Sequence, residues 1–137
     1  MAARRKKILI VDDEASVVSI LRRRLEAEGY DVLSAPDGTQ GLEQARTERP
    51  DLIISDVSMP SMDGYTFVKT LRATPEFSRI PVIVLTGKEG VKDLFFFEGV
   101  AECDYLVKPF EAPEIIEKIT TLLARVERHL GKEPPPR

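Results

Sequence analysis

The stretch Ile8-Leu9-Ile10-Val11-Asp12-Asp13-Glu14 joins four apolar residues directly to three acidic ones. Short continuous apolar runs are typical of strands that are buried on both faces of a parallel sheet. Such a strand ends at the rim of the sheet, so Asp12 and Asp13 are expected there. The stretch predicts both a buried parallel sheet and a polar site at one of its edges.

Three further apolar runs also end in polar residues. They are residues 52–55 before Asp56, residues 80–85 before Thr86, and residues 105–107 before Lys108 and Pro109. The strands of a parallel sheet place their carboxyl ends at one edge, where ligands bind in α/β folds. We therefore expect these polar residues and the Asp12-Asp13 pair to form a single site.

Amphipathic helical segments separate the strands. Apolar residues recur at helical spacing around residues 17–25, 42–45, 67–71, 91–98 and 115–126. Gly29 is expected to end the first helix, and Arg22, Arg23 and Arg24 are expected to face solvent. The half-polar run at residues 30–35 is typical of an edge strand. Five repeats of strand then helix predict an α/β fold with right-handed crossovers and helices on both faces of the sheet.

Length and composition predict one compact domain. The 137 residues are 42% hydrophobic, which suffices for one core but leaves no room for a second comparable domain. A formal net charge of -3 gives the chain no general attraction for nucleic acid. The single cysteine, Cys103, excludes an internal disulfide, and no apolar run is long enough for a signal peptide or a membrane span. We therefore expect a cytoplasmic protein that binds neither nucleic acid nor membranes.

The acidic residues indicate a metal ion. Asp12, Asp13 and Asp56 would repel one another at close range unless a cation joined them. Carboxylate oxygens suit Mg2+, and also Mn2+, and such an ion neutralises phosphoryl oxygens during transfer. Lys108 adds a point positive charge and Thr86 adds a hydroxyl donor. A carboxylate nucleophile, a metal, a lysine and a hydroxyl together describe an aspartyl-phosphate site.

In order and spacing, these motifs resemble the receiver domain of two-component response regulators over about residues 6–128. The resemblance implies a flavodoxin-like (βα)5 fold in three layers, doubly wound with the strand order 2-1-3-4-5. We divide the chain into a basic extension at residues 1–5, a receiver domain at 6–129 and a Pro-rich tail or linker at 130–137. The resemblance also implies that Asp56 accepts a phosphoryl group from a sensor histidine kinase or a phosphotransfer protein. The chain would then be a signalling phosphoacceptor and not an enzyme.

The resemblance assigns roles to the residues around the acceptor. Asp13 and Asp56 would hold Mg2+ directly, Asp12 would hold it through water, and the backbone carbonyl of Ser58 would be a further ligand. Lys108 would contact the phosphoryl group. The loop positions of the family are matched by Met59, Pro60, Gly64 and Pro109, and the bond before this last proline is often cis in the family.

The resemblance also implies a switch. Phosphorylation would draw Thr86 inward and let Tyr105 rotate from outside to inside. This motion would reshape the face built by the helix at 91–98, the strand at 105–107 and the helix at 115–126, where a partner or a second copy would bind. The same face carries the apolar run Leu94, Phe95, Phe96 and Phe97. Either at least one of these side chains is exposed for a partner, or two pack inward and the others are partly covered along the helix edge.

Alternatives remain open for the whole chain and for single residues. A phosphohydrolase with an aspartyl nucleophile would need a second acid at the position of Ser58. A degenerate receiver that acts as a constitutive interaction module usually lacks an acid, the threonine or the lysine. Asp12 or Asp13 could cap a helix as well, and Tyr105 could be an ordinary packing aromatic. The sequence also departs from the family by carrying Ala101-Glu102 where many receivers have Gly-Ala.

Overall fold

The computed structural model describes residues 5–57, 63–87 and 102–132, with side chains up to residue 127. These ranges contain five strands, four α-helices and one short 3-10 helix. In chain order the elements are β1 (Lys7–Val11), α1 (Ala15–Ala27), β2 (Asp31–Ala35), α2 (Gly38–Glu48), β3 (Leu52–Asp56), α3 (Gly64–Ala73), η1 (Pro75–Phe77), β4 (Val82–Thr86), β5 (Cys103–Val107) and α4 (Ala112–Lys132). All five predicted strands are confirmed, and so are the four predicted helices that lie within these ranges.

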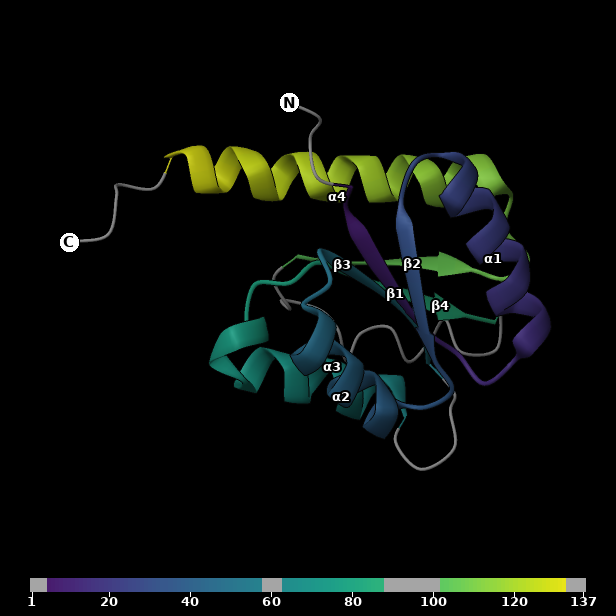
Figure 1. Ribbon diagram of the computed structural model, residues 1–137, viewed down its shortest axis with the longest axis horizontal. Helices are drawn as coiled ribbons and strands as arrows, with labels where there is room; N and C mark the ends of the chain where they lie inside the picture. The colour runs from purple at the N-terminus through teal and green to yellow at the C-terminus, as the bar shows by residue number, and fades with distance from the viewer. Residues whose placement is uncertain (1–4, 58–62, 88–101, 133–137) are drawn as a thin grey trace.

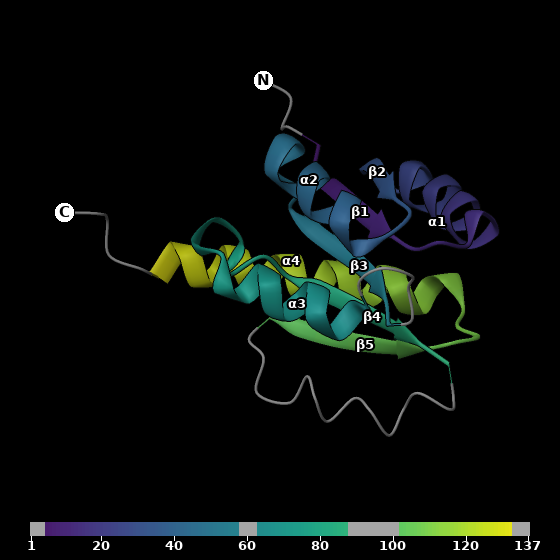
Figure 2. The same cartoon turned by 90° about the horizontal axis from the view of Figure 1, so that it is seen from below.

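The strands form one parallel sheet in the order β2-β1-β3-β4-β5, as Figure 2 shows. This order confirms the doubly wound topology. It places β2 at one edge, as its half-polar sequence predicts, and β5 at the other. β1, β3 and β4 lie inside the sheet, which explains why their sequences are continuous apolar runs without alternation.

Helices cover both faces of the sheet and make three layers. α1 and α4 lie over one face, and α2 and α3 lie over the other (Figure 1). Alternate residues of β1 lie on opposite faces of the sheet. Ile8 and Ile10 pack with α1 and α4, whereas Leu9 and Val11 pack with α2 and α3. The predicted helix at residues 91–98, with Leu94, Phe95, Phe96 and Phe97, lies outside the described residues.

Local sequence signals set the helix ends. Gly29 follows α1 with a φ of 97°, a left-handed conformation that glycine adopts without strain. The side chains of Asp37 and Asp63 accept backbone N–H groups in the first turns of α2 and α3. α4 continues to Lys132, three residues into the segment that the sequence predicts as a tail. None of the helices in the described ranges is long and apolar enough to cross a membrane.

One prediction about α1 is wrong. Arg23 and Arg24 are exposed, but Arg22 is half-buried and donates hydrogen bonds to the carbonyl of Val32 (2.8 Å) and to Oγ of Ser34 (3.1 Å). β2 is an edge strand, so part of its backbone has no neighbouring strand to pair with. Arg22 supplies that partner from the adjacent helix instead of facing solvent.

Candidate functional site

The polar residues at the strand ends meet at the carboxyl edge of the sheet. Asp56 and Thr86 are the last residues of β3 and β4, and Lys108 directly follows β5. Backbone hydrogen bonds continue past the strands and fix their relative positions: Asp12 N–H donates to Ala35 O (3.1 Å), and Lys108 N–H donates to Thr86 O (2.7 Å). The order of the strands thus brings together residues that are far apart in the sequence.

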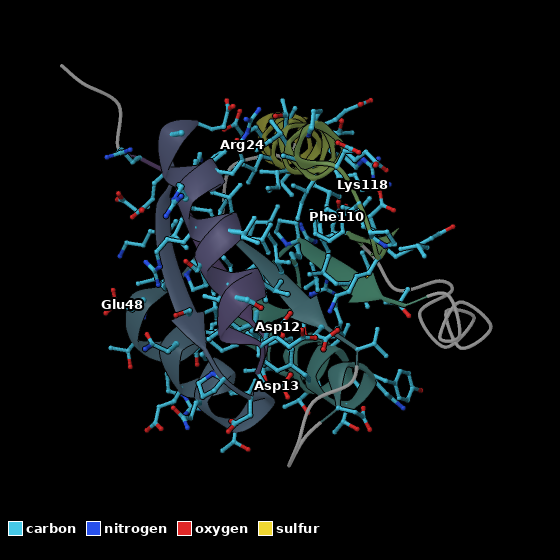
Figure 3. All side chains as sticks on the ribbon, turned by 90° about the vertical axis from the view of Figure 1, so that its right-hand side faces the viewer. Asp12, Asp13, Arg24, Glu48, Phe110 and Lys118 are labelled. Atoms are coloured by element: carbon cyan, nitrogen blue, oxygen red, sulfur yellow. The ribbon has the colours of Figure 1, made fainter. Side chains whose placement is uncertain are left out.

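Three carboxylates form the centre of the site. One oxygen each of Asp12, Asp13 and Asp56 lies within 4.8 Å of the other two. Asp12 is 2% exposed and Asp56 is 7% exposed, whereas Asp13 faces solvent. Figure 3 shows Asp12 and Asp13 beside the start of α1. The arrangement brings the predicted acidic triad together at one edge of the sheet.

The triad fits a hard divalent cation. Oδ1 of Asp12 accepts the N–H of Glu14 (2.9 Å), but Oδ2 is buried and has no hydrogen-bond partner. A buried carboxylate oxygen without a donor is costly unless a cation is close to it. Two buried acids and one exposed acid provide oxygen ligands on the side where water can complete the coordination shell.

Lys108 reaches into the same cluster. Its Nζ lies 3.2 Å from Oδ1 of Asp56 and 3.8 Å from both Oδ2 of Asp12 and Oε1 of Glu14. Three acids therefore contact Lys108, and a fourth, Asp13, joins two of them in the triad. Glu14 is the residue that sequence reasoning missed, although it directly follows the Asp12-Asp13 pair and this adjacency was the available signal.

Burial and charge perturb the ionisation of the cluster. Burial raises the pKa of Asp12, and the nearby Asp56 raises it further, while the N–H of Glu14 and the charge of Lys108 oppose the shift. Burial also raises the pKa of Asp56, against the opposing effect of Lys108. Burial lowers the pKa of Lys108, but Asp56 and Asp12 outweigh it, so the net shift is upward. A second cation would relieve the excess negative charge.

The two predicted switch residues lie on the neighbouring strands β4 and β5. Thr86 is buried, and its hydroxyl donates to the carbonyl of Gly87 (3.2 Å). Tyr105 is 47% exposed and lies outside the core. Its ring centroid is 5.9 Å from Nζ of Lys118, which also pairs with Asp104 at 3.1 Å. Tyr105 therefore has a half-exposed position on the face formed by β5 and α4.

The predicted loop positions are only partly within the described ranges. Ser58, Met59 and Pro60 lie outside them. The Lys108–Pro109 peptide bond is cis. Gly64 donates its N–H to Val57 O (2.8 Å), and a Cβ at this position would overlap the carbonyl oxygen of Asp56 and lie 2.8 Å from Cα of Val57. A glycine is therefore needed for α3 to begin against the end of β3.

The helix-capping alternative for the acidic pair is wrong. The N-cap residue of α1 is Glu14, and its side chain makes no capping hydrogen bond. The Asp12 carboxylate binds the N–H of this cap residue and not an N–H of the first turn. Asp12 and Asp13 therefore lie at the strand end without capping the helix, which agrees with a ligand-binding role.

Comparisons with a family model and with known proteins identify the same family. The model of the response regulator receiver domain family matches residues 8–120. The chain is 41% identical over 122 residues to the alkaline phosphatase synthesis transcriptional regulatory protein PhoP of Bacillus subtilis, covering 89% of this chain and 50% of PhoP. It is 38% identical over 119 residues to the transcriptional regulatory protein PrrA of Mycobacterium tuberculosis, covering 87% of this chain and 50% of PrrA. The chain thus spans about half the length of the curated relatives that it matches.

Solved structures of a response regulator and of a receiver domain are also similar to this chain. A putative response regulator from Chloroflexus aurantiacus is similar with a TM-score of 0.82 and 35% identity, over 88% of this chain and 99% of that one. The receiver domain of the sensor histidine kinase PA1611 from Pseudomonas aeruginosa is similar with a TM-score of 0.79 and 29% identity, over 88% of this chain and 99% of that one. The PA1611 structure has a magnesium ion coordinated in its active site cleft.

Proposed function

Because the chain belongs to the response regulator receiver domain family, we propose that it accepts a phosphoryl group on Asp56 in a magnesium-dependent reaction and so switches its binding to a partner. Receiver domains of this family act as phosphoacceptors and bind Mg2+ in an acidic pocket. The observation that carries the proposal is the cluster at the strand ends. There, Nζ of Lys108 lies 3.2 Å from a nearly buried Asp56 carboxylate that also belongs to the acidic triad.

In this proposal, Asp13 and Asp56 would hold Mg2+ directly, Asp12 would hold it through water, and the backbone carbonyl of Ser58 would be a further ligand. The ion, when bound, neutralises the charge on the transferring phosphoryl oxygens. The buried Oδ2 of Asp12, which has no hydrogen-bond partner, supports a role for this carboxylate in orienting the ligand shell. Mn2+ has similar ligand preferences and is a suitable replacement.

The transfer step uses residues at three strand ends. A carboxylate oxygen of Asp56 attacks phosphorus, the bond from phosphorus to the donor breaks, and the donor leaves with the electron pair. Lys108 and the hydroxyl of Thr86 bind the phosphoryl oxygens. Lys108 then exchanges its contact with the Asp56 carboxylate for one with the phosphoryl group attached to it.

The same step drives the switch. Thr86 moves toward the phosphoryl group, and Tyr105 turns from its half-exposed position into the space that is left. The face formed by β5 and α4 changes shape, and a partner that prefers one shape is recruited or released. We propose a sensor histidine kinase or a phosphotransfer protein as the donor. The acceptor of the signal is a downstream protein or a second copy of the chain.

The first test is the intact mass of the protein after incubation with magnesium and acetyl phosphate. We expect a labile adduct of about 80 Da, the mass of one phosphoryl group, in the wild type and none in Asp56→Asn. A control acid should lie outside the triad, as Asp37 does, whose side chain accepts the N–H of Gln40 (2.8 Å). Asp37→Asn is suitable, since asparagine also caps helices well, and this variant should be phosphorylated normally.

The outcomes separate the proposal from its alternatives. An adduct that also forms on Asp56→Asn would contradict the assignment of Asp56. No adduct with either acetyl phosphate or a histidine kinase donor, in protein that still binds Mg2+, would favour a constitutive interaction module. Multiple turnovers with an added phosphate ester would favour a phosphohydrolase.

A further inference from the structure

Glu14 lies beside the site but outside the acidic triad. Its Oε1 is 3.8 Å from Nζ of Lys108, the same distance at which Oδ2 of Asp12 lies from that nitrogen. The Glu14 side chain is 59% exposed, so it meets Lys108 at the mouth of the site. Lys108 thus has a buried partner, Asp56, and an exposed partner, Glu14.

The backbone of Glu14 is fixed, whereas its carboxylate has no capping role. Its N–H donates to Oδ1 of Asp12 (2.9 Å), and its carbonyl accepts the N–H of Val18 (3.1 Å). The side chain makes no capping hydrogen bond, although Glu14 is the N-cap residue of α1. Helix formation therefore does not explain why this carboxylate is directed at Lys108.

We infer that Glu14 is a positioning residue that competes with the phosphoryl group for Lys108 and repels anionic phosphodonors, and so limits the rate of Asp56 phosphorylation. This inference rests on the proposed function. Lys108 can bind an incoming phosphoryl oxygen only by loosening its contacts with carboxylates. A negative charge at the mouth of the site also opposes the approach of a negatively charged donor. Both effects slow donors of high charge more than donors of low charge.

With acetyl phosphate as the donor, phosphoryl transfer to Asp56 forms one bond and breaks another. A new bond forms between an Asp56 oxygen and phosphorus, the bond between phosphorus and the acetate oxygen breaks, and acetate leaves with the electron pair. No proton is consumed and no redox change occurs. The charge on Glu14 affects only how readily the donor dianion enters and how freely Lys108 meets it.

The test compares Glu14→Gln with a matched control, Glu26→Gln. Glu26 is exposed on the same helix, so its substitution removes the same charge from α1 without touching the site. Phosphorylation rates would be measured with acetyl phosphate and with the less charged phosphoramidate, at low and high salt. We expect Glu14→Gln to react about two- to fivefold faster with acetyl phosphate, the factor that corresponds to loss of an exposed ion pair. The gain should be smaller with phosphoramidate and at high salt, and Glu26→Gln should match the wild type.

Two further measurements separate positioning from a structural role. Beryllofluoride, a stable mimic of the phosphoryl group, should bind Glu14→Gln about two- to fivefold more tightly than the wild type. Adding Glu14→Gln to Lys108→Gln should raise beryllofluoride affinity less than adding it to the wild type, because only the direct repulsion of the anion then remains to be removed.

The possible failures are distinguishable. Rates and affinities of Glu14→Gln that equal those of Glu26→Gln, while the wild type is phosphorylated, would overturn the role of Glu14 alone. A faster rate that is the same for both donors and independent of salt would also overturn it. A wild type that neither forms the adduct nor binds beryllofluoride would overturn the proposed function and, with it, this inference.

Discussion

Replacing Asp12 by asparagine should stabilise the protein when no metal is present. The side chain is 2% exposed, and its Oδ2 has no hydrogen-bond partner. Asparagine keeps the same shape and retains an oxygen that can accept the N–H of Glu14. The substitution therefore removes a buried charge and little else.

The expected change in the free energy of unfolding follows from three effects on the charged Asp12 side chain. Repulsion from Asp56, whose ligand oxygen lies within 4.8 Å, is worth about 3.5 kcal/mol at an effective dielectric constant of about 20. Attraction to Lys108 at 3.8 Å is worth about 4 kcal/mol on the same scale. These two terms nearly cancel, so the burial of an unsatisfied carboxylate decides the sign. Relief of that burial is worth about 1–3 kcal/mol, and we expect Asp12→Asn to raise the free energy of unfolding by this amount.

The assay is urea unfolding at neutral pH with a chelator and with excess magnesium. In chelator, Asp12→Asn should unfold at higher urea than the wild type. Magnesium should stabilise the wild type more than the variant, because the stabilisation by a ligand increases with its affinity for the folded state, and the variant lacks one carboxylate of the triad. Asp37→Asn, which changes a half-buried helix-capping acid outside the triad to another good capping residue, should differ little from the wild type in both buffers. Loss of stability in chelator, or an equal response of Asp12→Asn and wild type to magnesium, would refute this reasoning.

Three further predictions concern pH and two backbone positions. In chelator, the stability advantage of Asp12→Asn should grow as the pH rises from 3.8, the ordinary pKa of an aspartate, through the raised pKa of Asp12. Over this range only the wild type has to ionise a buried acid in the folded state. Urea unfolding at a series of pH values checks this prediction. Gly64→Ala should cost about 1–3 kcal/mol, since its Cβ meets the backbone of Asp56 and Val57, and Gly41→Ala, whose Cβ meets side chains, should cost less in the same assay. Arg49→Gly should raise the free energy of unfolding by about 0.5–1 kcal/mol, because Arg49 has a φ of 49° after α2; an unchanged or lower urea midpoint would contradict this.

The parts of this fold that the sequence predicts are those that depend on burial. The run Ile8 to Val11 is apolar at every position because β1 packs against helices on both faces, and the same holds for β3 and β4. Once three strands are known to be parallel, the residues at their ends must share an edge. The positions of Asp12, Asp56 and Lys108 in one cluster follow from this topology without any knowledge of side-chain conformation.

The features that were missed depend on single side chains and single dihedral angles. Arg22 and Glu14 are long and polar, and each could have pointed into solvent at little cost; their contacts depend on what the next strand or loop presents. Glu102 has a φ of 54°, and its buried Oε2 has no hydrogen-bond partner. The departure from Gly-Ala at this position was visible in the sequence, but hydrophobic periodicity does not report the backbone conformation of one residue.

In the proposed function, the phosphorylation site and the face formed by β5 and α4 are coupled over a short path. β5 carries Tyr105 and ends directly before Lys108, so the two lie three residues apart, or about 10 Å along an extended strand. Tyr105 pairs with Val84 in β4, two residues before Thr86, and the N–H of Lys108 is bonded to the carbonyl of Thr86. Phosphorylation of Asp56 would therefore act on two adjacent strand ends that are already joined. A displacement there can change the exposure of Tyr105 and its contact with Lys118 without a long chain of intermediate residues.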